Sequence, residues 1–273
     1  MNLQELVKNF IVKPYPLSAL VIDGHQHHYY NYLALFHIVL VAKNKKKGFV
    51  IPEVRNGIKI CKKIKLHYKI VSGFLPIMAS KNNKIPENTT KEIINLFHNL
   101  KYAKHLVCSN DSTYDPDNRI VEDVEEYPTC CIDSFNENKW NDLTIAENQA
   151  TEENLDKSDK YYVEMIIAGS EEAYLNETMY NHTKSIMHEY AETREKYPFV
   201  FYQACSKCLA DSNSPSAKLN STYSMLCQKE FPDLYQKIIE GAQLDAKTKI
   251  SRWSKTWSEI QYEMLKGQFK NSS

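Results

Sequence analysis

The sequence predicts an α/β protein with a mixed central sheet flanked by helices. Short segments rich in β-branched and aromatic residues recur along the chain, and amphipathic helical patterns lie between and after them. The 42% apolar content of the 273 residues is enough to form a sizeable core. We find neither an internal repeat nor a glycine-rich phosphate loop, and the chain has only seven glycines, which argues against mononucleotide and dinucleotide cradles.

The charge pattern divides the chain into three segments, although the net charge is zero. Residues 1–110 contain 17 Lys or Arg against 5 Asp or Glu, residues 111–159 contain 3 against 15, and residues 160–273 contain 14 of each. We therefore expect a basic N-terminal α/β portion, an acidic linker or insertion, and a C-terminal portion with terminal helices.

The basic portion is expected to begin with a short helix, because Leu3, Leu6, Val7 and Phe10 recur at helical spacing. A capping-box pattern predicts a second helix over about residues 90–104. The remaining apolar segments favour strands, with the polar residues 23–32 forming a turn between the first two: Leu17–Asp23, Leu33–Ala42, Phe49–Ile51 and Lys59–Lys69. For Lys59–Lys69 the apolar positions are also compatible with a helix, which is the alternative interpretation.

The rest of the chain alternates predicted strands and helices. Strands are expected at Thr129–Ile132, Tyr161–Ala168 and Phe199–Tyr202. A helix is expected at residues 171–192, with a break around Asn181 as an alternative. Further helices are expected after the Ser214 cap with Pro215 in the first turn, and at Leu234–Glu240 before Gly241. A last helix is expected along a seam formed by Ile250, Trp253, Trp257, Ile260 and Met264. Cys130 and Cys131 are neighbours on one of these strands, where adjacent side chains point to opposite faces, so we do not expect them to share a metal.

The seven cysteines are expected to be free thiols or metal ligands rather than disulfides. The N-terminus lacks the pattern of a secretory signal, so we expect an intracellular protein, cytoplasmic or nuclear. The longest apolar run, Leu33–Ala42, is about half of the ~20 residues that span a bilayer, so no membrane segment is expected.

The strongest candidate site is the pair Cys205 and Cys208, which follows a predicted strand and precedes a helix. Thiolates three positions apart can reach one tetrahedral ion, and a helix N-terminus favours the thiolate form. The pattern therefore predicts a metal site, with zinc as the expected ion. Two buried core cysteines are the alternative interpretation.

His188 and Glu189 lie on a predicted helix upstream of this pair, and the arrangement resembles the zinc-dependent cytidine-deaminase-like superfamily. The resemblance implies a three-layer α/β/α fold in the C-terminal part, with His188, Cys205 and Cys208 as zinc ligands and Glu189 as the proton carrier. It also implies hydrolytic deamination of a nucleobase in a nucleotide or nucleic acid. His188 and Glu189 are adjacent rather than separated by one residue, and Ala204 replaces the family proline, so a catalytically inactive version is also open.

A second hypothesis is a non-catalytic nucleic-acid- or protein-binding module on the same scaffold. Lysines and tyrosines of the basic portion could bind a nucleic acid through its phosphate backbone and its bases. Alternatively, the same lysines pair with the acidic middle segment of the chain. The predicted seam through Trp253 and Trp257 is a candidate protein contact. The lysines named for a nucleotide or nucleic acid are Lys43, Lys45, Lys46, Lys47, Lys62 and Lys63.

A further histidine pair, His25 and His27, resembles the strand-end His-x-His of metal-dependent amidohydrolases. Those enzymes are barrels with repeated strand-helix units, and this chain lacks that pattern. We therefore expect residues 23–28 to form a solvated polar turn.

Overall fold

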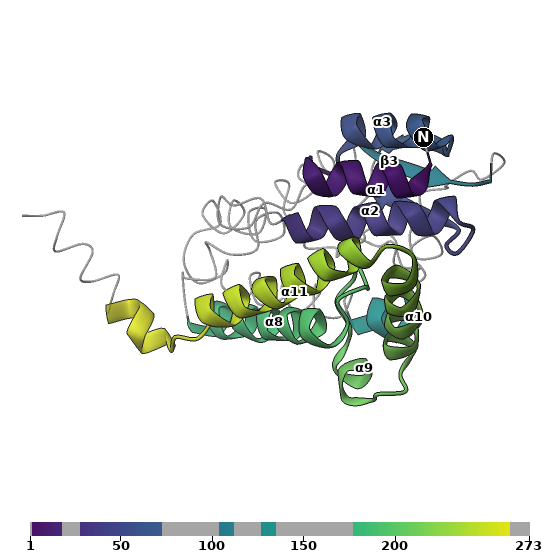
Figure 1. Cartoon of the computed structure of the whole chain (residues 1–273). Helices are drawn as coiled ribbons and strands as arrows, with labels where there is room; N and C mark the ends of the chain where they lie inside the picture. The colour runs from purple at the N-terminus through teal and green to yellow at the C-terminus, as the bar shows by residue number, and fades with distance from the viewer. Residues whose placement is uncertain (1, 18–27, 73–103, 112–126, 135–176, 263–273) are drawn as a thin grey trace, which may run out of the picture.

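The computed structural model describes residues 2–17, 28–72, 104–111, 127–134 and 177–262. It is a mixed structure in which helices predominate over one small sheet (Figure 1). Further short helices cover residues 129–134 and 257–262. The labelled elements are α1 (Leu3–Val12), α2 (His28–Ala42), β1 (Gly48–Ile51), α3 (Val54–Ile64), β2 (His67–Ser72), β3 (Lys104–Ser109), α8 (Glu177–Lys196), α9 (Ser206–Ala210), α10 (Pro215–Glu230) and α11 (Pro232–Arg252).

The sheet is three-stranded and antiparallel, with the order β1-β3-β2. Gly48 and His67 both lie opposite Ser109, so β1 and β2 begin at the same end of the sheet. The chain between them forms α3, whose buried Gly57 would place a Cβ only 3.0 Å from Ile51 Cγ2. Helix α3 therefore covers the face of the sheet on which Ile51 lies.

Helix α2 lies at the centre of the structure, and nearly all its side chains are buried. The prediction of a strand at Leu33–Ala42 is therefore wrong, because an uninterrupted apolar run is equally compatible with a helix that is buried on all sides. The predicted turn is also wrong from residue 28 onward, since His28 begins α2. Tyr29, Tyr30 and Tyr32 are buried in that helix and do not form a stacking surface.

Residues Lys59–Lys69 form the end of α3 and the start of β2 instead of one strand. The buried side of α3 contains Gly57, Ile60 and Cys61, which is the spacing of a helix. Strand β1 confirms the prediction at Phe49–Ile51, and α1 confirms the N-terminal helix.

The described residues after Glu177 form helices and connecting loops. Helix α8 continues through Asn181 without a break and lies beside α11 (Figure 1). The predicted cap at Ser214 is confirmed, because its side chain accepts a hydrogen bond from the Ala217 N–H at the start of α10. The predicted strand Phe199–Tyr202 is a turn and bend in the loop between α8 and α9.

Two predicted helix boundaries near the C-terminus are wrong. Helix α11 continues through Gly241 to Arg252, because glycine in a helix has a cost that close packing can offset. The predicted continuous seam is interrupted after Arg252, and the next helix begins at residue 257.

The main core combines the first and third charge segments. Phe10 of α1, Leu35 of α2, Phe49 of β1, Phe199 of the loop after α8 and Leu234 of α11 all belong to it. Among the helices that the structure describes, none has the length and apolar content needed to cross a membrane. The predicted elements at residues 18–23, 90–103 and 161–168, and the His25 and His27 pair, lie outside the described residues.

Candidate metal centre

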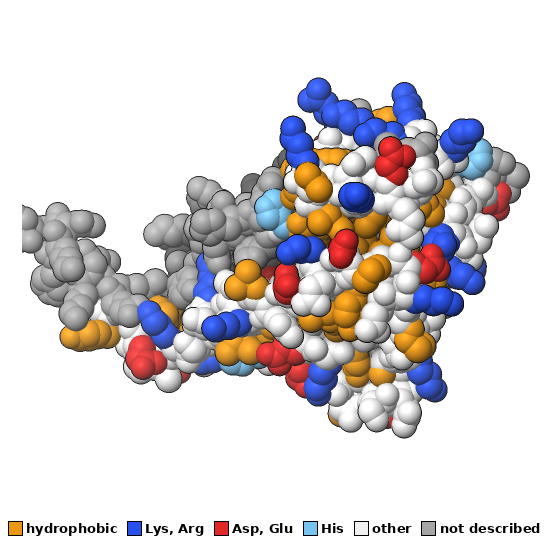
Figure 2. Space-filling view, in the orientation of Figure 1, with side chains coloured by type: hydrophobic (Ala, Val, Ile, Leu, Met, Phe, Trp, Pro, Cys, Tyr) orange, Lys and Arg blue, Asp and Glu red, His pale blue; other side chains and the backbone are white. Residues whose placement is uncertain are grey.

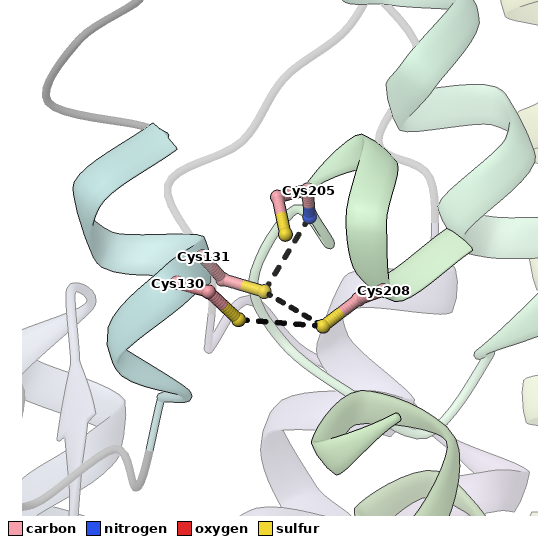
Figure 3. Close-up of side chains that lie close together, drawn as sticks. All are labelled: Cys130, Cys131, Cys205 and Cys208. Atoms are coloured by element: carbon pink, nitrogen blue, oxygen red, sulfur yellow. Dashed lines mark hydrogen bonds between the residues drawn. The ribbon is translucent and has the colours of Figure 1, made fainter. Parts of the chain in front are cut away.

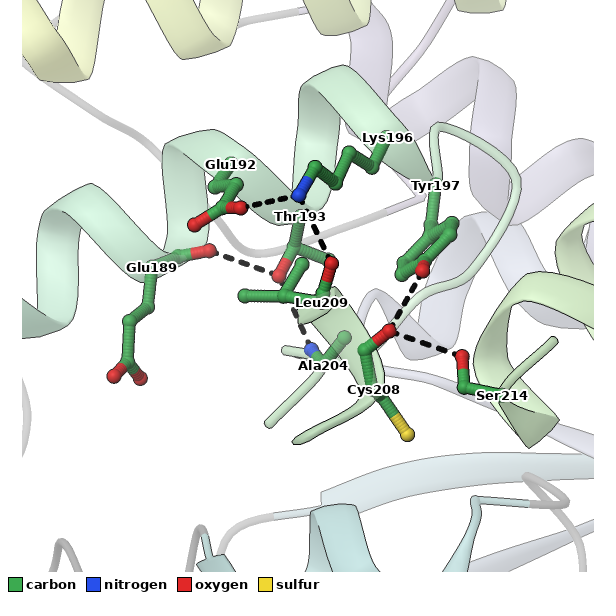
Figure 4. Close-up of polar contacts among 9 residues, drawn as sticks. All are labelled: Glu189, Glu192, Thr193, Lys196, Tyr197, Ala204, Cys208, Leu209 and Ser214. Atoms are coloured by element: carbon green, nitrogen blue, oxygen red, sulfur yellow. Dashed lines mark hydrogen bonds and ion pairs between the residues drawn. The ribbon is translucent and has the colours of Figure 1, made fainter. Parts of the chain in front are cut away.

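The C-terminal turns of α8 hold the loop that leads to Cys205. The guanidinium of Arg194 donates to the Val200 carbonyl at 2.6 Å and to the Tyr202 carbonyl at 3.3 Å. Further along the loop, the Ala204 N–H donates to the Thr193 hydroxyl at 3.1 Å (Figure 4). Arg194 and Thr193 are buried, so α8 fixes the backbone just before the first cysteine of the pair.

The backbone at Cys208 is fixed from three sides. The Tyr197 hydroxyl donates to the Cys208 carbonyl at 2.7 Å, and the Ser214 hydroxyl donates to the same oxygen at 3.0 Å. Lys196 Nζ donates to the neighbouring Leu209 carbonyl at 2.9 Å (Figure 4). These contacts close the end of α9, and the Cys208 side chain points away from α8 (Figure 4).

A second pair of cysteines meets this loop from the acidic segment. Residues 129–134 form a short helix in which the N–H groups of Cys131 and Ile132 donate to the Pro128 carbonyl at 2.8 and 3.1 Å. The predicted strand at Thr129–Ile132 is therefore wrong. Adjacent side chains on a helix differ by about 100°, whereas they point to opposite faces of a strand. Cys130 and Cys131 can consequently face the same loop.

The four thiols of Cys130, Cys131, Cys205 and Cys208 converge, and their Sγ atoms all lie within 4.8 Å of one another (Figure 3). The Sγ of Cys208 is 3.5 Å from that of Cys130 and 3.7 Å from that of Cys131. These distances exceed the ~2.0 Å of a disulfide, and the cysteines are free. Thiolates around one tetrahedral ion at a metal–sulfur distance of about 2.3 Å lie about 3.8 Å apart. The group could therefore hold a metal ion.

Burial and hydrogen bonding shift the pKa values of Cys130, Cys131 and Cys208 in different directions. Burial raises the pKa of Cys130 to about 11 and raises the pKa of Cys131 still further. Burial also opposes ionisation of Cys208, but hydrogen bonds from Ser216 and from the thiols of Cys130 and Cys131 outweigh it and lower the Cys208 pKa to about 7. The Cys208 sulfur thus accepts hydrogen bonds from the thiols of Cys130 and Cys131.

Ser216 and Tyr202 form the polar surroundings of the sulfurs. The Ser216 hydroxyl is buried, lies 3.5 Å from Cys131 Sγ and accepts a hydrogen bond from the Tyr202 hydroxyl at 2.9 Å. The Cys205 N–H donates to Cys131 Sγ at 3.4 Å. Donors of this kind orient thiolate ligands and stabilise their charge.

His188 and Glu189 do not join the group of four thiols. Nε2 of His188 donates to the Trp253 carbonyl at 3.2 Å, and the Glu189 carboxylate accepts from Gln203 Nε2 at 2.9 Å. The structure thus brings together Cys205 and Cys208 of the predicted site, with Cys130 and Cys131 as the additional thiols.

The tryptophans named as a possible protein contact pack within the chain. Trp253 is buried, and its ring lies 5.5 Å from the ring of Tyr180 on α8. Trp257 is half-buried at 5.7 Å from the same tyrosine. Trp253 is therefore a core residue of the α8–α11 pair.

Comparison with protein-family models, with curated proteins and with solved structures finds no match to this chain. The candidate centre is therefore defined by its own geometry. The sequence did contain a signal for the two missed thiols: Pro128 precedes the Cys130–Cys131 pair, and proline is frequent where a helix begins.

Proposed function

We propose that this protein is a zinc-binding protein with a structural centre of four cysteine ligands. The ion would join the short helix of residues 129–134 to α9 and the start of α10. The observation that carries the proposal is the convergence of Cys130, Cys131, Cys205 and Cys208 within 4.8 Å. The Cys205–Cys208 pair has the Cys-x-x-Cys spacing that is typical of structural zinc sites, and the adjacent Cys130 and Cys131 would supply the other two ligands.

Zinc fits the donors better than other ions do. Four thiolates in a tetrahedral arrangement favour zinc or iron, whereas magnesium and calcium prefer oxygen ligands. The Cys208–Cys130 and Cys208–Cys131 sulfur distances of 3.5 and 3.7 Å suit ligands of a single ion. A cluster with several irons would place its ligands on different metal atoms and farther apart.

A full set of four protein ligands favours a structural role over a catalytic one. Catalytic zinc sites commonly have three protein ligands and leave the fourth position to water or substrate. Deamination at Glu189 and the deaminase-like three-layer fold stay predictions. The thiol set supports a closed centre better, because His188 bonds to Trp253 and Glu189 bonds to Gln203.

The packing around the thiols explains why a metal would matter here. Cys131, Cys205 and Cys208 belong to a small cluster of eight buried residues, in which Val200, Ala204 and Leu209 are the aliphatic members. Small cores provide little hydrophobic stabilisation, and metals commonly supplement them. The centre would therefore hold the acidic segment against the C-terminal helices, and the protein would act as a binding module.

Metal analysis of the reduced 273-residue chain tests the proposal. We expect about one zinc per chain, and we expect the double variant Cys131→Ser/Cys208→Ser to lose it. Cys227→Ala is the matched control, because Cys227 is buried in the main core and is not part of the four-thiol group. Metal-free protein with four reduced thiols, or undiminished zinc in the double variant, would overturn the proposal.

The identity and role of the ion need two further measurements. Iron in place of zinc, with its visible absorption, would reject zinc. A structural ion predicts that chelation lowers the melting temperature and that added zinc restores it. Deamination of a nucleobase that Glu189→Gln abolishes without loss of zinc would instead favour the catalytic hypothesis.

A further inference from the structure

Helix α3 presents a row of cations on its outer side. Arg55, Lys59, Lys62 and Lys63 are exposed and follow helical spacing, while the opposite side is buried. With a rise of 1.5 Å per residue, the row extends over about 12 Å. Among the described residues no carboxylate pairs with these four side chains. In the space-filling view, Lys and Arg side chains gather where Figure 1 places α3 (Figure 2).

The sheet register brings a second basic segment to the same end of the sheet. Strands β1 and β2 both begin opposite Ser109, so Lys47 before β1 and Lys65 before β2 lie at that end. The Ser109 hydroxyl donates to the Lys47 carbonyl at 2.9 Å. Lys45, Lys47 and Lys65 are exposed. Two lysine-rich segments that are separate in the sequence thus form one cationic surface.

Some residues of the predicted basic surface are engaged elsewhere. Lys43 forms an ion pair with Glu230 at 2.6 Å, and Lys46 is buried with its Nζ 3.1 Å from His37 Nδ1.

Tyr68 on β2 is 36% exposed. In the pairing of β2 with β3 it lies opposite Cys108, which also lies opposite Phe49 of β1. Tyr68 is therefore on the same side of the sheet as α3, because cross-strand partners share a face.

A nucleic acid fits this surface better than a membrane does. Basic amphipathic helices bind membranes by inserting an apolar face, but the apolar face of α3 already packs against Ile51. Cations one helical turn apart can follow successive phosphates of one strand, and an exposed aromatic ring offers a stacking surface for a base. We propose that α3 and Tyr68 bind single-stranded nucleic acid through its phosphates and one stacked base.

This proposal goes beyond the metal centre and uses none of its residues. Fluorescence anisotropy of the zinc-loaded 273-residue chain with a labelled single strand of about 20 nucleotides, measured at several salt concentrations, tests it. The triple variant Lys59→Gln/Lys62→Gln/Lys63→Gln should bind at least about tenfold more weakly. Its slope of log K against log salt should fall by about 2, because each phosphate contact contributes about 0.7.

The matched control is Lys218→Gln/Lys229→Gln/Lys247→Gln, which removes the same charge from exposed positions of α10 and α11. It should bind like the unmodified protein. Tyr68→Ala should weaken single-strand binding by about fivefold or more without changing the salt slope, and Tyr68→Phe should retain binding. Duplex of the same length should not respond to Tyr68→Ala.

Four results would overturn the proposal. These are equal losses in both triple variants, no single-strand binding at about 50 mM salt, an unchanged affinity in Tyr68→Ala, and preferential binding to phosphatidylserine vesicles. The second result would be expected if the chain's own acidic segment occupied the surface. Circular dichroism and zinc content show whether each variant is folded, so loss of binding by an unfolded variant does not count as support.

Discussion

The sulfur atoms of Cys131 and Cys208 lie 3.7 Å apart, although 77 positions separate the two residues in the sequence. One belongs to the acidic middle of the chain and the other to the helical C-terminal portion. Four thiols at such distances suit a metal, because thiolates bind divalent ions in exchange for their protons. Metal binding and the placement of residues 127–134 should therefore be linked.

Ser216→Ala should weaken both the metal site and the fold. The hydroxyl contacts Cys131 Sγ and accepts from Tyr202, so its loss removes a donor near the sulfurs and leaves the Tyr202 hydroxyl unpaired. We expect a roughly 10–100-fold lower metal affinity. Stability should fall by about 1–3 kcal/mol. Chelator competition and urea unfolding measure the two effects. Ser221→Ala, at an exposed position of the same helix, should change neither.

His188→Ala should leave the zinc content unchanged. Three side chains on one side of α8 bond to the backbone after α11: Tyr180 and Lys184 contact the Lys255 carbonyl, and His188 contacts that of Trp253. Loss of one such bond should lower stability by about 0.5–1.5 kcal/mol. Metal analysis together with thermal unfolding distinguishes this outcome from the predicted ligand role, for which zinc would be lost as in Cys208→Ser.

The helices with clear end signals could be predicted from the sequence. The cap at Ser214 followed by Pro215 defined the start of α10, and the spacing of apolar residues defined α1. Helix α2 could not be distinguished from a strand, because its apolar residues extend around the whole helix and leave no period. Its identity depends on the tertiary structure that buries it.

The metal centre was predicted only in part for a related reason. Cys205 and Cys208 are close in sequence, so their spacing alone suggested a site. The participation of Cys130 and Cys131 depends on a helix that the sequence favoured as a strand, and on a contact between distant segments. His188 was selected by its distance along the chain from Cys205, but its imidazole bonds to the end of α11.

The stability of the protein should fall as the pH falls below about 6.5, partly because of His37. Burial lowers the pKa of His37, and nearby Lys46 and Arg194 lower it further, while the hydrogen bond to the Phe199 carbonyl opposes them. The unfolded chain therefore binds a proton that the folded chain excludes, so stability is full above the unfolded pKa and decreases below it.

His37→Gln removes this titration and provides the comparison. Urea unfolding between about pH 5 and 7 gives the free energy of unfolding at each pH for both proteins. This free energy should rise with pH more steeply in the unmodified protein than in His37→Gln, by at most about 1.4 kcal/mol per pH unit. Glutamine can still donate to the Phe199 carbonyl, so the variant should fold. Identical pH slopes in the two proteins would show that His37 is not held neutral.

Gly241→Ala should destabilise the protein, although alanine favours a helix by about 1 kcal/mol over glycine. A Cβ at position 241 would lie 2.7 Å from Tyr29 Cβ and 3.2 Å from Tyr29 Cα. Tyr29 cannot easily move, because it is buried and its hydroxyl donates to the Pro198 carbonyl at 2.9 Å. Overpacking of this kind typically costs about 1–3 kcal/mol, so we expect a net loss of about 1 kcal/mol.

Thermal unfolding of Gly241→Ala measures that balance between helix propensity and packing. Gln243→Ala introduces alanine at an exposed position of α11, and it should be neutral or slightly stabilising. A higher melting temperature for Gly241→Ala than for the unmodified protein would mean that α2 and α11 do not approach closely at Tyr29. Gly241 would then lower the stability of α11 through its poor helix propensity, and no close contact with Tyr29 would require a glycine there.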